Sequence, residues 1–153
     1  MLKELFPEGR FGSPVHLDRL ALVEGELGIT MPLPLRRLYL ECDGFREPTG
    51  NAQYLFSLDD PGSDTSLVAM TRFWWFDWKT IASPRSAIDF TPFLFFGSSC
   101  CDHIWGIRCN GPAEIIAYHH SMEDKYDVVG HDILDVYRKD YAEYELGGSD
   151  NFN

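Results

Sequence analysis

Cysteine and histidine side chains of the types that bind zinc gather in one stretch of the chain: Cys100, Cys101, His103, Cys109, His119 and His120. Structural zinc sites usually use cysteines two to four residues apart, which can close on one ion. Cys100 and Cys101 are adjacent instead, and adjacent side chains on a strand point to opposite faces. We therefore expect small buried or half-buried free thiols, with no metal and no other cofactor. Zinc binding, redox sensing and a vicinal disulfide are the alternatives.

A second group, Asp102 and His103 with Ser98 and Ser99 nearby, contains the residue types of a hydrolytic site. Hydrolysis by such a group requires a nucleophile, a base and an orienting residue at hydrogen-bond distance, and sequence neighbours on a strand seldom meet that geometry. We expect Asp102 to shape a turn and His103 to be an ordinary surface or interface histidine. The sequence thus predicts no catalytic residues, and a small metal-binding or hydrolytic enzyme is a weak rival.

Composition and charge limit the class of protein. The 153 residues fit one domain, and a hydrophobic content of 44% suffices for one core. The net charge of −11 disfavours nucleic acid as a partner, because phosphates would be repelled. No signal peptide and no apolar run of membrane-spanning length is present, so we expect a cytoplasmic protein without a membrane partner.

The acidic residues are concentrated near the C-terminus. From His119 to Asn153 there are nine acidic and three basic residues, a balance of −6. This excess has two interpretations, a solvated face that keeps the protein soluble or a surface that steers a basic partner.

The first half of the chain predicts a pair of helices and one strand. Ser13-Pro14 is a typical helix start, and the apolar spacing predicts a helix over Val15–Leu27 that ends at Gly28. Pro32 and Pro34 bound an extended link before a second helix over Leu35–Cys42. A strand is predicted over Ala52–Leu58, and a short helix running into a loop over Thr65–Trp78.

The second half predicts a sheet followed by one helix. Phe93–Phe96, Ile104–Cys109 and Ala113–Tyr118 indicate consecutive antiparallel strands, the last two joined by a hairpin-like turn. His131–Glu145 returns to helical spacing, Gly147-Gly148 marks its end, and a loose tail follows from Asp150. The predicted fold is therefore α+β, with an N-terminal helix pair, a central antiparallel meander sheet and a C-terminal helix.

Several short motifs occur in an order that resembles the SUKH superfamily (Smi/Knr-like domains). Its N-terminal signature is matched by Leu27-Gly28, Met31-Pro32, Leu38-Tyr39-Leu40 and Asp43-Gly44, and its later pattern by Phe95-Phe96-Gly97, Asp102 and the strands and helix that follow. The similarity spans about Leu17 to Tyr144, so the whole chain, 1–153, is expected to be a single SUKH-like domain with a core of about residues 15–146. Two residues depart from the pattern: Met31 replaces the usual Leu, and Cys101 replaces a Gly whose freedom to adopt positive φ a Cys lacks.

The resemblance implies a non-enzymatic binding fold, used in bacteria for immunity proteins that neutralise polymorphic or contact-dependent toxins, often nucleases. The expected partner is a cognate toxin domain of basic character. The alternative is an intracellular regulatory or scaffold module with the same fold. We expect the contacts to come from acidic side chains and one tryptophan: Asp59, Asp60, Asp64, Trp78, Glu123, Asp124 and Asp127. Of the aromatic run Phe73–Trp78, Phe73 and Trp78 are the predicted exposed rings; the other interpretation places most of the run in the core.

Overall fold

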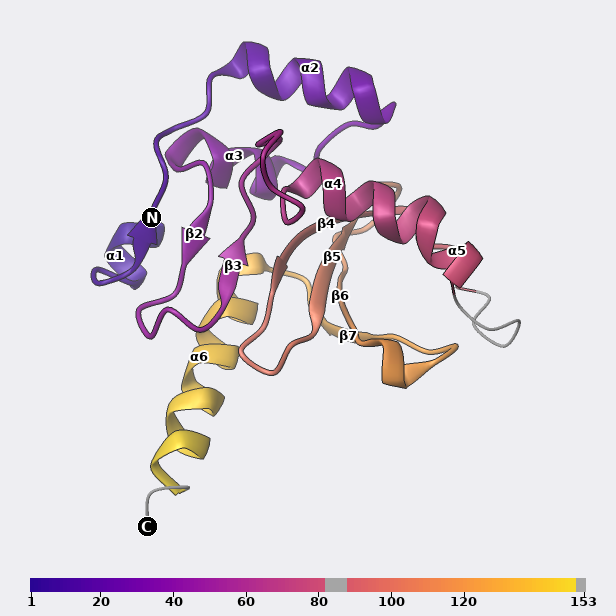
Figure 1. The fold of residues 1–153 in the computed structure, drawn as a ribbon. Coiled ribbons are helices and arrows are strands. Elements are labelled where there is room, and N and C mark those ends of the chain that lie inside the picture. Colours follow the sequence, from indigo (N-terminus) through magenta and orange to yellow (C-terminus); the bar gives the residue numbers. More distant parts are fainter. Residues whose placement is uncertain (82–87, 151–153) are drawn as a thin grey trace.

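The structure, a computed structural model, describes residues 1–81 and 88–150 and has the predicted α+β class (Figure 1). The helices are α1 (Leu2–Leu5), α2 (Leu17–Leu27), α3 (Leu33–Glu41), α4 (Leu67–Arg72), the π-helical η1 (Phe73–Asp77), α5 (Trp78–Ile81), the 3₁₀ turn η2 (His120–Met122) and α6 (Ile133–Asp150). A three-stranded antiparallel sheet contains β1 (Arg10–Phe11), β2 (Phe45–Arg46) and β3 (Gln53–Leu55). A four-stranded antiparallel sheet contains β4 (Phe93–Ser98), β5 (Ile104–Arg108), β6 (Ile115–Tyr118) and β7 (Asp127–Gly130).

The N-terminal helix pair is present, with shifted starts. The predicted start at Ser13-Pro14 is wrong, because the backbone N–H of Val15 donates to the carbonyl of Tyr39 at 2.9 Å and holds this segment extended. His16 is the N-cap, without a side-chain hydrogen bond. Gly28 ends α2 as predicted, in the left-handed conformation with φ of 68°. Helix α3 starts earlier than predicted and includes Pro34 in its first turn.

The two sheets adjoin at β3 and β4. Phe56 donates its backbone N–H to the carbonyl of Phe96 at 2.7 Å, just beyond the end of β3. Gly97 lies so close to β3 that a Cβ atom there would come within 1.9 Å of the Tyr54 carbonyl oxygen. The junction therefore depends on a residue without a side chain. The predicted strand Ala52–Leu58 is shorter in the structure, and β1, β2 and β7 were not predicted.

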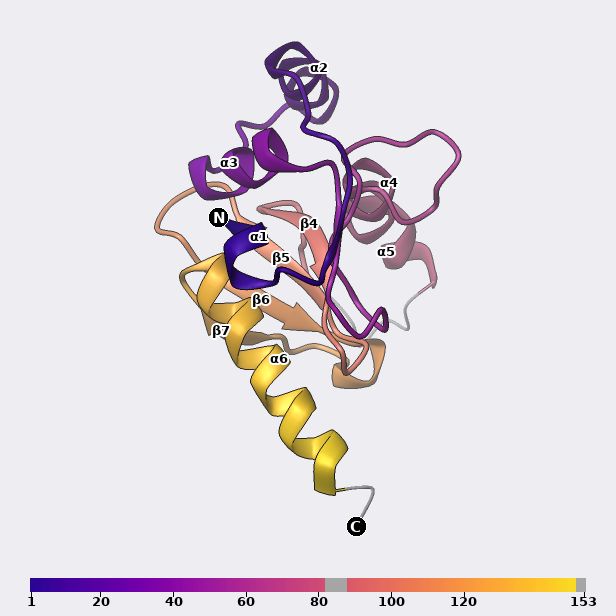
Figure 2. The same ribbon diagram turned by 90° about the vertical axis from the view of Figure 1, so that its left-hand side faces the viewer.

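Helices cover both faces of the four-stranded sheet, with α6 and the α4–α5 segment on opposite sides (Figure 2). On the α6 side, the ring of Tyr137 stacks on Tyr54 at 4.8 Å and lies 5.5 Å from Trp105. On the α4 side, the ring of Trp74 meets Tyr118 edge to face at 5.4 Å and lies 5.9 Å from Phe95. The core is thus built largely of aromatic rings.

The segment predicted to leave its helix for a loop stays helical from Leu67 to Ile81. Within it, the N–H of Trp78 bonds to the carbonyl of Phe73, five residues back, which defines a π turn. The extra residue in that turn shifts the rings that follow. As a result Phe76 is 59% exposed, whereas Phe73 and Trp78 are only partly exposed and pack against the core, contrary to the prediction.

Helix α6 continues through Gly147 and Gly148 to Asp150, so these glycines do not end it. Glycine costs a helix about 1 kcal/mol per residue but does not forbid one. Of the predicted loose tail, Asp150 is helical, and residues 151–153 lie outside the described residues.

Candidate functional site

A groove runs between α4 and the turn η2, over the ends of β5 and β6. It consists of two adjoining hollows of about 310 and 500 Å³ that share Thr65 and Met70. The first hollow is also lined by Phe56, Trp74, Ser98, Asp102, Ile104, Tyr118, His119 and His120, and the second by Asp64, Ala69, Phe73 and Asp77. We call this surface the α4 groove. Its sides come from segments far apart in the chain, so it exists only in the folded protein.

The floor of the α4 groove is apolar and tightly packed. Trp74 is buried, and its ring lies 5.1 Å from both Phe73 and Trp78. The indole N–H groups of Trp74 and Trp78 are buried and have no hydrogen-bond partner among the described residues. Both rings approach Tyr118 nearly edge to face, an arrangement in which rings attract each other. The floor is therefore a firm aromatic platform.

The rim of the groove is acidic. Asp64, Asp77 and Asp102 are exposed, and none forms an ion pair within the part of the chain that the structure describes. A rim of unpaired carboxylates around aromatic side chains favours cationic and amphipathic ligands.

Asp102 occupies the β4–β5 turn, as predicted from the sequence. It has a φ of 65°, which an Asp tolerates better than most residues, whereas Cys101 does not have positive φ. Ser99, buried beneath the turn, accepts the backbone N–H groups of Cys101 and His103 on its hydroxyl oxygen, at 3.2 and 3.1 Å. The Cys at this position therefore needs no unusual conformation. Ser99 acts as a turn cap.

Three histidines lie at the η2 side of the groove. The ring of His119 is 4.1 Å from that of His120 and 5.8 Å from that of His103. His119 Nδ1 lies 2.7 Å from the hydroxyl oxygen of Ser121 and 3.2 Å from the backbone nitrogen of the same residue, so these contacts attach the imidazole ring to the η2 turn.

The predicted contact residues lie in several separate parts of the structure. Asp64 lines the α4 groove, and Trp78 supports its floor. Asp60 is exposed, and its carboxylate accepts the N–H of Gly62 at 3.0 Å within its own turn. Asp64 belongs to the β3–α4 loop. This loop is separated from the η2 turn, since the two lie at different heights in both Figure 1 and Figure 2.

The other predicted residues lie at or beyond the η2 end. The hydroxyl of Tyr118 donates to the carbonyl of Glu123 at 2.7 Å, which places Glu123 next to the groove. Asp124 is exposed on the following loop. Asp127 lines a different hollow, between β7 and α6. The predicted residues thus do not form one continuous patch.

Asp59 already has a partner within the protein. Arg19 Nε donates to Asp59 Oδ1 at 2.8 Å, and Arg19 Nη1 lies 3.2 Å from Asp43 Oδ2. The hydrogen bond to Asp59, together with the charge of Asp43, raises the pKa of Arg19 above its ordinary value. Asp43 also accepts the backbone N–H of Leu58 at 2.7 Å. Asp59 therefore helps to fix the β3–α4 loop to α2, and its charge is balanced by Arg19.

The four cysteines are free thiols. Burial raises the pKa of Cys42, Cys100 and Cys109 to about 12. Within residues 1–81 and 88–150, no cluster of three or more His, Cys, Asp or Glu has the arrangement needed to hold a metal ion. The same residues include no helical segment with the length and apolar character needed to span a lipid bilayer.

No model of a known protein family matches this chain, and no curated protein matches it.

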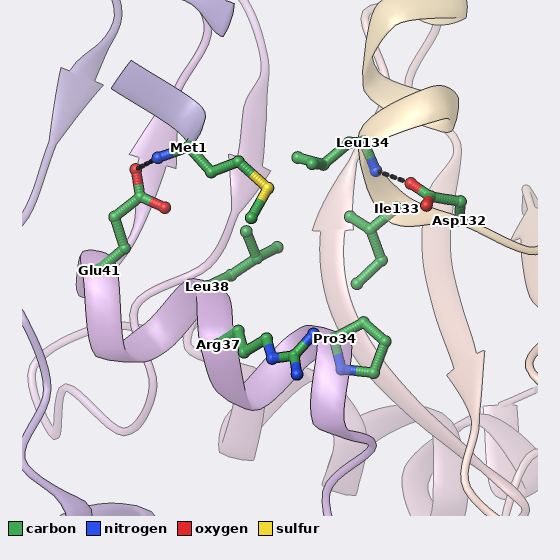
Figure 3. A pocket seen from close by; sticks show the side chains of 8 residues that line it. All are labelled: Met1, Pro34, Arg37, Leu38, Glu41, Asp132, Ile133 and Leu134. Atoms are coloured by element: carbon green, nitrogen blue, oxygen red, sulfur yellow. Dashed lines mark hydrogen bonds and ion pairs between the residues drawn. The ribbon is translucent and has the colours of Figure 1, made fainter. Parts of the chain in front are cut away.

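A smaller hollow of about 180 Å³ lies between α3 and the start of α6 (Figure 3). Arg37 and Pro34 of α3 line one side of it, and Ile133 and Leu134 line the other. The α-amino group of Met1 closes one end through a 2.8 Å ion pair with Glu41. We favour the α4 groove, because it is larger and combines aromatic and acidic side chains.

The sequence interpretation missed Asp77 and Phe76, which lie beside each other on the π turn. The available signal was a single acid within the aromatic run Phe73–Trp78. It also missed Glu47, which is fully buried although charged. The Glu47 carboxylate accepts the N–H groups of Thr49, Asn51 and Ala52 at 2.7 to 3.0 Å, so its role is to fold the β2–β3 loop.

Proposed function

We propose that this protein is a non-catalytic immunity protein of a bacterial polymorphic or contact-dependent toxin system, which binds a basic toxin domain through the α4 groove. The observation that carries the proposal is the aromatic floor of this groove with the exposed carboxylates of Asp64, Asp77 and Asp102 at its rim. The resemblance to the SUKH superfamily agrees with this function. A regulatory or scaffold module with a housekeeping partner is the alternative.

The groove has the two components of a strong protein interface. Aromatic side chains and Met supply most of the binding energy at such surfaces, and Met70 and Phe73 line the groove from one helical segment. Charged side chains at the rim mainly set specificity and the association rate. Asp64 and Asp77 lie in that position.

The charge of the whole chain supports the same partner. A net charge of −11 attracts a basic domain over long range and accelerates encounter, and the effect weakens as salt increases. A toxin that acts on nucleic acid has a basic substrate-binding surface. An acidic protein that occupies or flanks this surface would exclude the substrate without any chemical step.

The test is co-expression in bacteria with the C-terminal domain of a large secreted toxin encoded beside this chain's gene. We expect growth only when this protein is present, and a complex of the two proteins that survives gel filtration. Equal killing with and without the protein, together with no complex, would contradict the proposal. Rescue by a variant that cannot fold would show that growth does not depend on binding.

A further inference from the structure

Strand β7 is the outer strand of the four-stranded sheet. In the described residues it pairs only with β6, through Ile115↔Gly130, Ile116↔Val128 and Ala117↔Asp127, with a register irregularity between Ile115 and Ile116 that leaves Val129 without a direct partner. The side chain of Val128 at its centre is 51% exposed. An outer strand with an exposed apolar side chain can accept another strand.

The register shows which backbone groups point outward. Arg108 donates its N–H to the carbonyl of Glu114, so Glu114 faces β5, and in an antiparallel ladder alternate residues of one strand face the same neighbour. Ile116 therefore also directs its N–H and C=O to β5. Val128, directly opposite Ile116, makes no ladder hydrogen bonds to β6 and directs its N–H and C=O away from the sheet. Outside the strand ladders, Val128 makes no backbone hydrogen bond in the described part of the chain.

A groove and an acidic margin accompany this edge. A hollow of about 350 Å³ lies between β7 and α6, and its charged lining residues are Asp127, Asp140 and Glu143 together with one base, Lys139. Residues 123–132 contain four acids, one Lys and one His. A strand that lies along β7 would thus pass between carboxylates, which favours lysine or arginine side chains at its flanks.

We propose that β7 binds an extended basic segment of a partner protein by strand addition, with the N–H and C=O of Val128 pairing with the backbone of that segment. Pairing of β7 with a second copy of this chain is disfavoured, because it brings the acidic margin of one copy next to the acidic margin of the other. The inference goes beyond the proposed function, since it requires a basic strand and not a toxin. Main-chain hydrogen bonds provide the affinity, and alternate side chains provide the specificity.

The test uses the ¹⁵N-labelled full chain and the synthetic peptide acetyl-KVKVKVK-amide. At saturating peptide we expect the amide of Val128 to exchange with solvent at least tenfold more slowly, while the amide of Asp127, already paired with Ala117, changes little. The matched controls are acetyl-EVEVEVE-amide, and the basic peptide with alternate backbone nitrogens methylated so that they cannot donate. Neither control is expected to protect Val128.

A basic peptide that binds without protecting Val128 would overturn the inference, as would equal protection by the methylated peptide. Protection that rises with protein concentration in the absence of peptide would identify a second copy as the occupant, and would also overturn it. The variant Val128→Pro removes the outward N–H and is expected to weaken binding of the basic peptide at least tenfold. The peptide controls do not depend on how that variant folds. Because the probe is synthetic, failure to neutralise a toxin would leave this result intact.

Discussion

The hydroxyl of Tyr54 donates a 2.8 Å hydrogen bond to Asp140 Oδ2, and the same oxygen accepts the backbone N–H of Cys100 at 3.1 Å. One carboxylate of α6 thereby connects β3 of the smaller sheet to the β4–β5 turn of the larger one. That turn carries Asp102 at the rim of the α4 groove. The position of the rim thus depends on a polar contact on the opposite side of the sheet.

Replacement of Tyr54 by Phe removes this contact and leaves the ring in place. We expect the free energy of unfolding to fall by about 1.5–3 kcal/mol, since the lost hydrogen bond is to a carboxylate in a partly buried position. Urea denaturation measures the change. The control is Tyr144→Phe, which removes a more exposed hydrogen bond to Asn51 and is expected to cost less than about 0.5 kcal/mol. Equal losses for the two variants would contradict the role given to Tyr54.

Gly97→Ala tests the junction of the two sheets. The new Cβ would meet the Tyr54 carbonyl oxygen at 1.9 Å, so the strands must separate, and we expect a loss of about 2–4 kcal/mol. Gly25→Ala is the matched control, because a Cβ there meets no atom within 4 Å and alanine favours the interior of α2. That variant should gain about 0.5–1 kcal/mol. The two changes, measured by thermal unfolding, should have opposite signs.

Arg19→Met tests the ion-pair network at the start of the β3–α4 loop. Because Arg19 contacts Asp43 and Asp59 together, its loss should cost about 1 kcal/mol. Arg72→Met is the control. Arg72 forms a 3.7 Å ion pair with Glu26 in which both side chains are exposed, so this pair should contribute almost nothing to the free energy of unfolding. A cost for Arg19→Met no greater than that for Arg72→Met would show that the loop is held by other contacts.

Alkaline pH should destabilise the protein through Cys42. Burial raises the pKa of this thiol from 9.0 to about 12, so between these values the unfolded chain loses a proton that the folded chain retains. The contribution of the Cys42 thiol to the free energy of unfolding is therefore fully present below pH 9. It is lost as the pH rises toward 12, by up to about 1.4 kcal/mol per pH unit. Urea denaturation of the wild type and of Cys42→Ala measures this. The difference in the free energy of unfolding between the wild type and Cys42→Ala should be constant from pH 7 to 8 and should become smaller above pH 9. A constant difference up to pH 11 would show that the pKa of Cys42 is not raised by folding.

The sequence predicted elements whose pattern extends over several residues, and missed those that depend on distant partners. Helices α2, α3 and α6 and strands β4 to β6 have enough apolar positions to show their period. Strands β1 and β2 contain only two residues each, and their pairing joins Phe11 to Phe45 across the whole helix pair. Such short segments contain no periodicity, because their conformation is set by tertiary contacts.

The candidate site was predicted only in part, for similar reasons. Charge and turn signals led to Asp64, which lines the groove, but also to Asp59, whose partner Arg19 lies forty residues away and cannot be inferred from spacing. Trp78 was predicted to be an exposed ring of the aromatic run, but because of the π turn the exposed ring is Phe76. One additional residue per turn is invisible to a pattern that assumes 3.6 residues.

The affinity of charge-reversed variants for the co-expressed toxin domain decides whether the α4 groove is the binding surface. The double variant Asp64→Lys with Asp77→Lys should lose at least tenfold in affinity, or about 1.4 kcal/mol, and should associate more slowly at low salt. Glu4→Lys with Glu8→Lys makes the same change in net charge on exposed residues of the N-terminal segment around α1, and should bind within twofold of the wild type. Equal losses for the two double variants would mean that only overall charge matters, and an unchanged affinity for the groove variant would contradict the proposed site.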